Sequence, residues 1–113
     1  MKIEGYNFGE ITVNGKTYRA DIIIFPDKVK PDWWRKEGHS LCIEDLEDVL
    51  KEKPEVLIIG TGAYGAMRVP DETLRVLRER GIEVKVLPTK LACEEFNKLV
   101  DKKKVVAALH LTC

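Results

Sequence analysis

The sequence lacks several features that would place it quickly in a class of protein. Its longest apolar runs are far too short to span a membrane, and no signal peptide is evident at its start. Net charge is absent, because 19 lysines and arginines balance 19 aspartates and glutamates. Without a broad basic footprint, nucleic acid is a poor partner. We therefore expect neither membrane insertion nor nucleic-acid binding.

Cysteine is also scarce. The three cysteines, Cys42, Cys93 and Cys113, are odd in number and widely spaced, and none belongs to a C-x-x-C pair. This pattern predicts no disulfide framework and no zinc site, and it favours a reducing, cytoplasmic location. We expect no metal and no other cofactor. A chain of 113 residues is expected to form a single domain, 1–113, with a core of its own.

Residues 1–35 have the pattern of antiparallel strands. Asn14-Gly15 lies between alternating residues and predicts a tight hairpin in which Ile11 faces Tyr18. The run 22–25 is continuously apolar and predicts a buried strand.

Residues 43–113 change to a helix followed by a β-α-β-α-β pattern. Successive parallel strands joined by helices form one sheet, and the continuous apolar run near its start is typical of a central strand. The predicted fold is α/β in three layers, with this parallel sheet between helices and an N-terminal antiparallel sheet. The expected helices are 43–52, 71–80 and one from Thr89, and the expected strands are 56–59, 82–86 and 105–111.

Strand 82–86 alternates apolar and polar residues, so it is expected near an edge of the sheet. An edge strand can pair with a second copy of the chain, but the charges of Glu83 and Lys85 can equally discourage such pairing. The sequence therefore leaves monomer and homodimer open.

Residues 60–65 read G-x-G-x-x-G, which is the sequence fingerprint of a dinucleotide site. In that fingerprint the helix begins at once and its N-terminus holds the pyrophosphate. Here Val69-Pro70 delays the next helix, because a residue before proline avoids the helical conformation. The following strand also ends at Leu87-Pro88-Thr89 without the acid that binds a ribose. The glycines therefore predict a tight turn rather than a dinucleotide site.

The location of that turn still suggests a ligand site. Ligands of open α/β sheets bind beyond the carboxyl ends of the strands, and a helix N-terminus offers N–H groups to an anion. Thr89 is also expected to cap its helix. The sequence thus predicts a pocket for a small anion, and the candidate residues at the three strand ends are Gly60, Thr61, Gly62, Pro88, Thr89 and His110.

Four further residues are candidates from their chemistry. Trp34 and Arg35 can form the rim of a pocket or a protein contact, since both residue types are common in binding hot spots. His39 and Ser40 lie in a polar loop, where His39 can act as an acid or base and Ser40 can simply assist a helix start.

Cys93 is a fifth candidate of this kind. It lies in the second turn of the expected helix, where the helix N-terminus can activate a thiol. The same position also lies beside the apolar stripe of that helix, where a thiol would be buried and inert.

Short motifs over nearly the whole chain resemble one small family of proteins. The family includes an adipogenesis-associated human protein, a mitochondrial complex I assembly factor, and uncharacterised bacterial and archaeal members. The motifs that carry the resemblance are Leu57–Gly62, Val69-Pro70, Gly81–Val84, Thr89-x-x-Ala92-Cys93-x-x-Phe96-Asn97, His110–Cys113, and Trp34-Arg35 followed by Gly38, His39 and Ser40. The resemblance implies the same three-layer fold, and its eukaryotic members imply assembly or regulatory work.

No set of nucleophile and acid–base residues is evident in the sequence. Together with the resemblance, this predicts a small non-enzymatic assembly or regulatory factor that acts through contacts with an unidentified protein partner. The alternative is a small-molecule or anion-binding protein, and an enzyme if it converts that ligand, with its site at the C-terminal ends of the parallel strands.

Overall fold

The computed structural model describes all residues from Met1 to Cys113. Strands β1 to β3 form a three-stranded antiparallel sheet, and the other strands form a five-stranded sheet in the order β5-β4-β8-β6-β7. None of the helices is long and apolar enough to cross a membrane. The elements are β1 (Ile3–Asn7), β2 (Glu10–Val13), β3 (Lys16–Tyr18), β4 (Ile22–Ile24), β5 (Val29–Lys30), the 3-10 helix η1 (Ile43–Leu46), α1 (Glu47–Glu52), β6 (Val56–Thr61), α2 (Asp71–Glu79), β7 (Glu83–Leu87), α3 (Thr89–Leu99) and β8 (Val105–His110).

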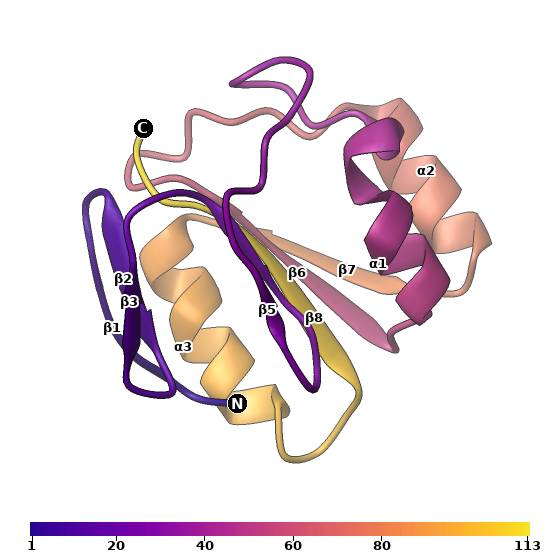
Figure 1. Cartoon of the computed structure of the whole chain (residues 1–113). Coiled ribbons are helices and arrows are strands. Elements are labelled where there is room, and N and C mark those ends of the chain that lie inside the picture. The colour runs from indigo at the N-terminus through magenta and orange to yellow at the C-terminus, as the bar shows by residue number, and fades with distance from the viewer.

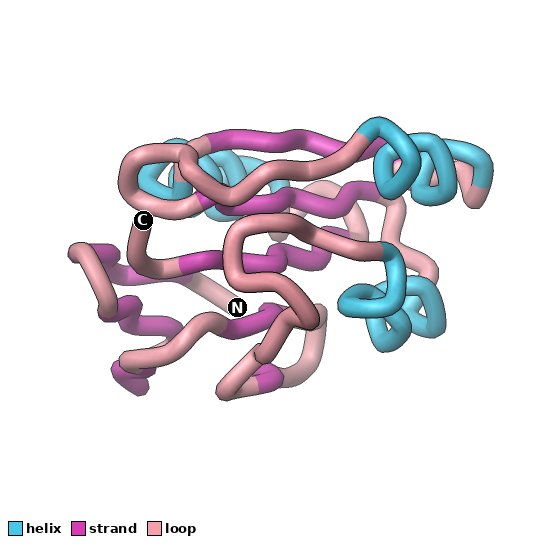
Figure 2. Tube along the Cα trace, turned by 90° about the horizontal axis from the view of Figure 1, so that it is seen from above, coloured by secondary structure: helices cyan, strands magenta, loops and turns pink.

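The five-stranded sheet lies between two covering layers (Figure 1). Helices α1 and α2 cover one face, and α3 together with the three-stranded sheet covers the other. The view from above shows the same order, with the small sheet on the left and α1 and α2 on the right (Figure 2). This arrangement confirms the predicted three-layer α/β fold.

Two buried clusters hold the layers together, and strand β8 contributes to both. Its residues Val105, Ala107 and Leu109 face α3 and the small sheet, whereas Val106 and Ala108 face α1 and α2. Side chains of a strand point alternately to opposite faces, so a strand covered on both sides must be apolar throughout. All six residues of β8, and all six of the neighbouring β6, are buried.

Several local predictions are confirmed. Ile11 pairs with Tyr18 across the Asn14-Gly15 turn, and both turn residues have positive φ angles. Helix α2 begins directly after Pro70, and β7 lies at an edge of the five-stranded sheet. Turn chemistry and proline geometry act over a few residues, which is why the sequence predicts them well.

The structure differs from the expected layering in one respect. Strands β4 and β5 do not belong to the N-terminal sheet; β4 pairs antiparallel with β8 and extends the central sheet. All three residues of β4 are buried, and a strand in a covering layer would expose one face to water. Helix α3 accordingly shares its layer with only three antiparallel strands.

The first helix covers its predicted range, but its first turn is not α-helical. Residues 43–52 are helical, but they begin as the 3-10 helix η1 before α1 follows. Asp45 supports this start, because its carboxylate accepts the N–H of Cys42 at 3.0 Å and that of Lys36 at 3.1 Å. Asp45 therefore fixes the connection between the 32–42 loop and the helical layer.

Candidate functional site

The carboxyl ends of the three parallel strands meet at one edge of the central sheet. Thr61 at the end of β6 pairs with His110 at the end of β8. The Thr89 hydroxyl, at the start of α3, accepts the Gly62 N–H at 2.8 Å and donates to the His110 carbonyl at 2.5 Å. The structure thus brings together the residues that the sequence placed at these strand ends.

Thr89 does not cap its helix, contrary to the sequence prediction. Pro88 occupies the N-cap position, and Thr89 is the first residue of α3. Its hydroxyl is fully buried and bridges β6 and β8 instead of turning back onto the helix. Helix-capping propensity alone predicts threonine at the N-cap. Here the neighbouring strand ends provide a buried donor and a buried acceptor, and the hydroxyl bonds to these instead.

The glycine loop uses most of its N–H groups within the protein. Gly62 donates to Thr89, Ala63 donates to the Thr112 carbonyl at 2.6 Å, and Met67 donates to the Thr61 carbonyl at 3.1 Å. An anion cradle requires N–H groups that are free to point at the ligand. The loop at residues 60–67 therefore offers an anion few of the donors that the sequence prediction assumed.

The glycines themselves are required by close packing. A Cβ atom on Gly60 would lie 2.8 Å from a Leu109 methyl and 2.9 Å from the Thr89 hydroxyl. Gly62 has a φ of +104°, and a Cβ atom there would lie 2.6 Å from the Cys113 carbonyl oxygen. These positions support the turn geometry predicted from the sequence, as does the start of α2 only at Asp71.

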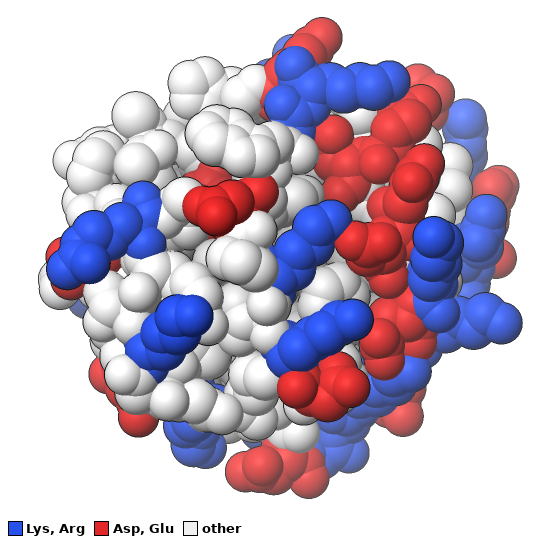
Figure 3. Space-filling model, in the orientation of Figure 1, with Lys and Arg blue, Asp and Glu red and all other residues white.

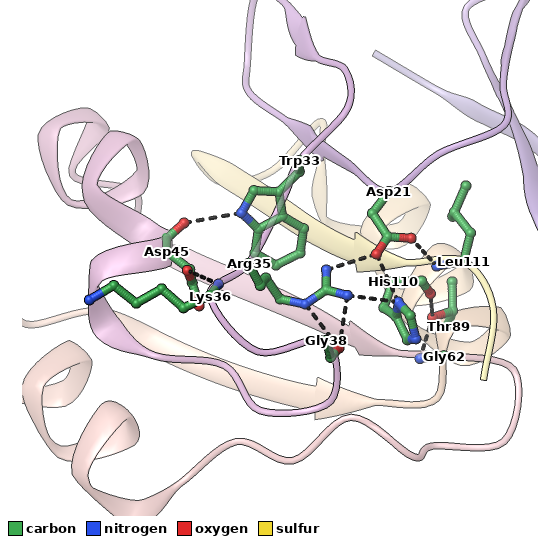
Figure 4. Close-up of polar contacts among 10 residues, drawn as sticks. All are labelled: Asp21, Trp33, Arg35, Lys36, Gly38, Asp45, Gly62, Thr89, His110 and Leu111. Carbon is green, nitrogen blue, oxygen red and sulfur yellow. Dashed lines mark hydrogen bonds and ion pairs between the residues drawn. The ribbon is translucent and has the colours of Figure 1, made fainter.

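A buried cluster of charged residues adjoins this edge (Figure 4). The carboxylate of Asp21, just before β4, lies 2.8 Å from Nη1 of Arg35 and 2.8 Å from Nδ1 of His110. Its other oxygen accepts the Leu111 N–H at 2.7 Å. The side chains of Arg35 and His110 are 5% and 7% exposed, and that of Asp21 is 15% exposed. We call these three residues the Asp21 cluster.

The 33–38 loop holds Arg35 in place. Its Nε and Nη2 atoms donate to the Gly38 carbonyl at 3.3 and 3.0 Å, and its guanidinium lies 4.8 Å from the centre of the Trp33 ring. Trp33 is buried in turn, and its Nε1 donates to the Asp45 carbonyl at 3.1 Å. Trp33 and Arg35 are thus anchored by hydrogen bonds and stacking.

Electrostatics keep Asp21 ionised. Burial raises the pKa of its carboxyl, but hydrogen bonds from His110, the Leu111 N–H and Arg35 outweigh burial and leave the pKa below its ordinary value. A buried carboxylate of this kind is tolerated only because a cation and several donors surround it. Asp21 therefore organises the cluster as its single negative charge.

His110 is oriented by this carboxylate. Because Asp21 accepts at 2.8 Å, geometry assigns the hydrogen to Nδ1, and the Arg35 Nη2 atom at 3.1 Å is then a close neighbour rather than a hydrogen-bond donor. The Nε2 atom is buried and has no hydrogen-bond partner, and the His39 ring packs edge-on at 5.9 Å between ring centres. A carboxylate-oriented imidazole with a free nitrogen can accept a proton or a hydrogen bond.

A cavity of about 340 Å³ opens beside the Asp21 cluster. It lies between the end of β3, the 32–38 loop and the end of β8, and its lining includes Arg19, Asp21, Asp32, Trp34, His110 and Thr112. No group of three His, Cys, Asp or Glu side chains is arranged to hold a metal ion. The chemistry available here is hydrogen bonding, charge and aromatic stacking.

Large aromatic side chains are exposed around the same edge of the sheet. Trp34 is 83% exposed, Tyr64 is 79% exposed and Phe8 is 55% exposed. Phe8 and Tyr64 lie 6.1 Å apart between ring centres, and Gly9 and Ala63, the residues beside them, both contact the C-terminal residues 111–112. Exposed aromatics gathered in one region of a small protein commonly mark a contact site.

Two other predicted residues, Cys93 and Ser40, make no hydrogen bond or ion pair with the Asp21 cluster. Cys93 belongs to the core beneath the small sheet, and burial, followed by the nearby charge of Glu94, raises the pKa of its thiol to about 12. Of the two alternatives for Cys93, an activated thiol or a buried and inert one, the structure supports the second. Ser40 forms backbone bridges to Glu37 and Arg68, and its hydroxyl makes no hydrogen bond.

Sequence reasoning missed the centre of the cluster, Asp21, as well as Phe8 and Tyr64. The only local indication of Asp21 was a charged residue directly before a fully buried strand. Its importance depends on the pairing of β4 with β8, which joins residues 22 and 109 and which no local pattern reveals. Phe8 and Tyr64 lie within turns and carry no periodic pattern at all.

Comparison with known proteins places these features in a family. A family model described as "Protein of unknown function (DUF498/DUF598)" matches residues 3–110, and the chain belongs to this family. It is 34% identical over 109 residues to NADH dehydrogenase (ubiquinone) 1 alpha subcomplex assembly factor 3 from Danio rerio, and 31% identical over 111 residues to the protein of that name from Homo sapiens. These alignments cover 94% and 96% of this chain, and 61% and 59% of the relatives.

The chain thus spans about three fifths of the length of these curated relatives. Solved structures agree on the fold over the whole chain. The conserved hypothetical protein PH1505 from Pyrococcus horikoshii OT3 has a TM-score of 0.85 and 33% identity, with 100% of both chains covered. The protein MT938 has a TM-score of 0.81 and 31% identity, with 99% of this chain and 98% of its own covered. The family resemblance predicted from the motifs is confirmed.

Proposed function

We propose that this protein is a non-enzymatic assembly or regulatory factor that binds a protein partner through the exposed aromatic surface formed by Phe8, Trp34 and Tyr64. The observation that carries the proposal is Trp34, a large apolar side chain that is 83% exposed. Tryptophan is among the residues that contribute most to binding when a partner covers them. Leaving it in water has no evident structural benefit.

The anchoring of Trp34 supports this role. Its neighbour Trp33 is buried, and the backbone N–H of Trp33 donates to the Asp21 carbonyl at 2.8 Å. Its other neighbour, Arg35, belongs to the Asp21 cluster. Trp34 is therefore presented from a fixed backbone, and little conformational entropy is lost when a partner covers it. On this reading the buried cluster is the support of a binding surface rather than a reaction centre.

The relatives suggest the kind of partner. The curated relatives are named as assembly factors of NADH dehydrogenase, and we extend to this chain only the general role of binding a subunit of a multi-protein complex during its assembly. The cytoplasmic location and the choice between monomer and homodimer stay predictions from the sequence.

Affinity purification with matched variants tests the proposal. The chain, tagged and expressed in its own cells, is compared with Trp34→Ala, Tyr64→Ala and the control Leu91→Ala, which removes an exposed apolar side chain on α3. We expect one subunit of a multi-protein complex to be recovered by wild type and control, and at least about tenfold less by Trp34→Ala, as for a binding hot spot. Equal recovery by Trp34→Ala would overturn the proposal.

A second candidate function is binding of a small molecule in the 340 Å³ cavity. The observation that favours it is the unpartnered Nε2 atom of His110, a residue that lines this cavity. A thermal-shift screen with phosphate, nucleotides, coenzymes and carboxylic acids tests it, because a ligand at a hundred times its Kd adds about 2.7 kcal/mol of stability. A shift for one class that Arg19→Gln abolishes would support this function, and a flat screen would remove it.

A further inference from the structure

The surface on the other side of Trp34 is strongly acidic. A second cavity of about 350 Å³ lies there, between the 32–34 segment and the start of the helical layer, and it shares Asp32, Trp33 and Trp34 with the first cavity. We call it the acidic groove. Its charged lining consists of five carboxylates and one lysine: Asp32, Glu44, Asp45, Glu47, Asp48 and Lys30.

Most of this negative charge has no partner within the protein. Lys30 pairs with Asp48 at 2.6 Å, and Asp45 accepts two backbone N–H groups. Asp32, Glu44 and Glu47 are exposed and make no ion pair. Figure 3 shows the result as a band of red atoms over the position that α1 occupies in Figure 1, next to a largely uncharged area. The groove therefore carries an excess of negative charge beside an exposed indole.

Helix stabilisation explains only part of this pattern. Acidic residues near the N-terminus of a helix interact favourably with its dipole, which accounts for some of the carboxylates on η1 and α1. Asp32 and Trp34 come from the loop that precedes η1, outside the helices, and both line the groove. The loop and the start of the helical layer thus supply acids and an aromatic wall to one depression.

We propose that the acidic groove binds an extended basic segment of the protein partner. Its lysine or arginine side chain enters between the carboxylates, and an adjoining apolar side chain covers Trp34. Carboxylates are the natural acceptors of guanidinium and ammonium groups, and the face of a tryptophan ring also attracts cations. The negative potential repels nucleic acid and anionic lipid, which leaves a cationic peptide as the complementary occupant. This inference rests on the proposed function, because it assigns the chemistry of the partner at the Trp34 surface.

Fluorescence anisotropy with short labelled peptides tests the inference. The probes alternate leucine with arginine, with glutamine or with glutamate, and differ in nothing else. The test variant is Glu44→Gln/Glu47→Gln, and the matched control is Glu72→Gln/Glu94→Gln, which removes the same charge from exposed sites on α2 and α3. We expect the arginine peptide to bind wild type and control equally and the test variant about 3- to 10-fold more weakly at low salt. That difference should shrink as salt rises from about 50 to 200 mM.

The outcomes separate the inference from the proposed function. Equal affinity of the arginine peptide for test variant and wild type, or equal affinity of wild type for the three peptides, overturns the basic-segment inference. Absence of arginine-peptide binding also overturns it. None of these results affects the co-purification test with Trp34→Ala, which can still uphold a protein contact of different chemistry. Circular dichroism melting of each variant confirms that the chain is folded.

Discussion

Removal of the Asp21 carboxylate should destabilise this protein more than most single substitutions. Asp21→Ala deletes the acceptor for His110 and for the Leu111 N–H, and it also deletes the ion-pair partner of Arg35. The guanidinium then remains in place with its side chain only 5% exposed and without a counter-charge. Breaking a buried ion pair from one side costs about 3–5 kcal/mol, chiefly because the other charge stays buried.

The size of this loss is large relative to the whole stability. A domain of this length has a free energy of unfolding of about 5–15 kcal/mol, and each lost kcal/mol lowers the Tm by about 3–6 °C. We therefore expect Asp21→Ala to melt roughly 10–30 °C below wild type at neutral pH. Urea unfolding followed by circular dichroism measures the free energy, and an unchanged m value shows that the unfolding reaction is the same.

A double variant provides the sharper test. Arg35→Met in the Asp21→Ala background removes the stranded charge but keeps an apolar side chain against Trp33. The double variant should be more stable than Asp21→Ala alone, because the desolvation cost of the unpaired guanidinium disappears. A loss below about 1 kcal/mol in Asp21→Ala, or simple additivity in the double variant, would refute the reasoning that charge pairing holds this cluster together.

Three further predictions concern acid stability, the glycine loop and the buried thiol. The pKa of Asp21 is lower in the folded protein than its ordinary 3.8, so its contribution to stability is present above that value and is lost as the pH falls through the folded pKa. When melting is measured as a function of pH, Asp21→Asn should therefore lose less stability than wild type at acid pH. Gly62→Ala should cost at least about 2 kcal/mol in urea unfolding, since φ is +104° and the new methyl would lie 2.6 Å from a backbone oxygen; a loss under about 0.5 kcal/mol would contradict this. Cys93, whose thiol pKa is raised to about 12, should resist iodoacetamide at pH 7 in mass spectrometry while the exposed Cys113 reacts, and equal labelling of both would show that Cys93 is accessible.

The loop at residues 60–67 could be predicted from the sequence only in part. Val69-Pro70 and the missing acid at the end of the following strand argue against a dinucleotide site, and α2 does begin after Pro70. The anion pocket was predicted from the same loop, but the loop's N–H groups bond to residues 61, 89 and 112, whose positions depend on the packing of three strands. A sequence shows which donors exist, but only the folded chain shows which of them are already used.

The same limit applies to the surface that we propose for binding. Trp33 and Trp34 are neighbours of identical type, and the sequence could not decide which one faces the core. The structure buries Trp33 against Arg35 and leaves Trp34 in water, because Asp21, Arg35 and His110 fix the loop from three separate segments.

Apolar periodicity, turn residues and prolines by themselves determined most of the elements, their order and the three-layer class of this protein. These features act within one strand, helix or turn, and the sequence contains them directly. Tertiary structure alone decided that β4 extends the central sheet, that Asp21 meets Arg35 and His110, and that Trp34 stands between the cavity beside the Asp21 cluster and the acidic groove. Such contacts join residues far apart in the chain, and their energies exist only when the whole core is packed.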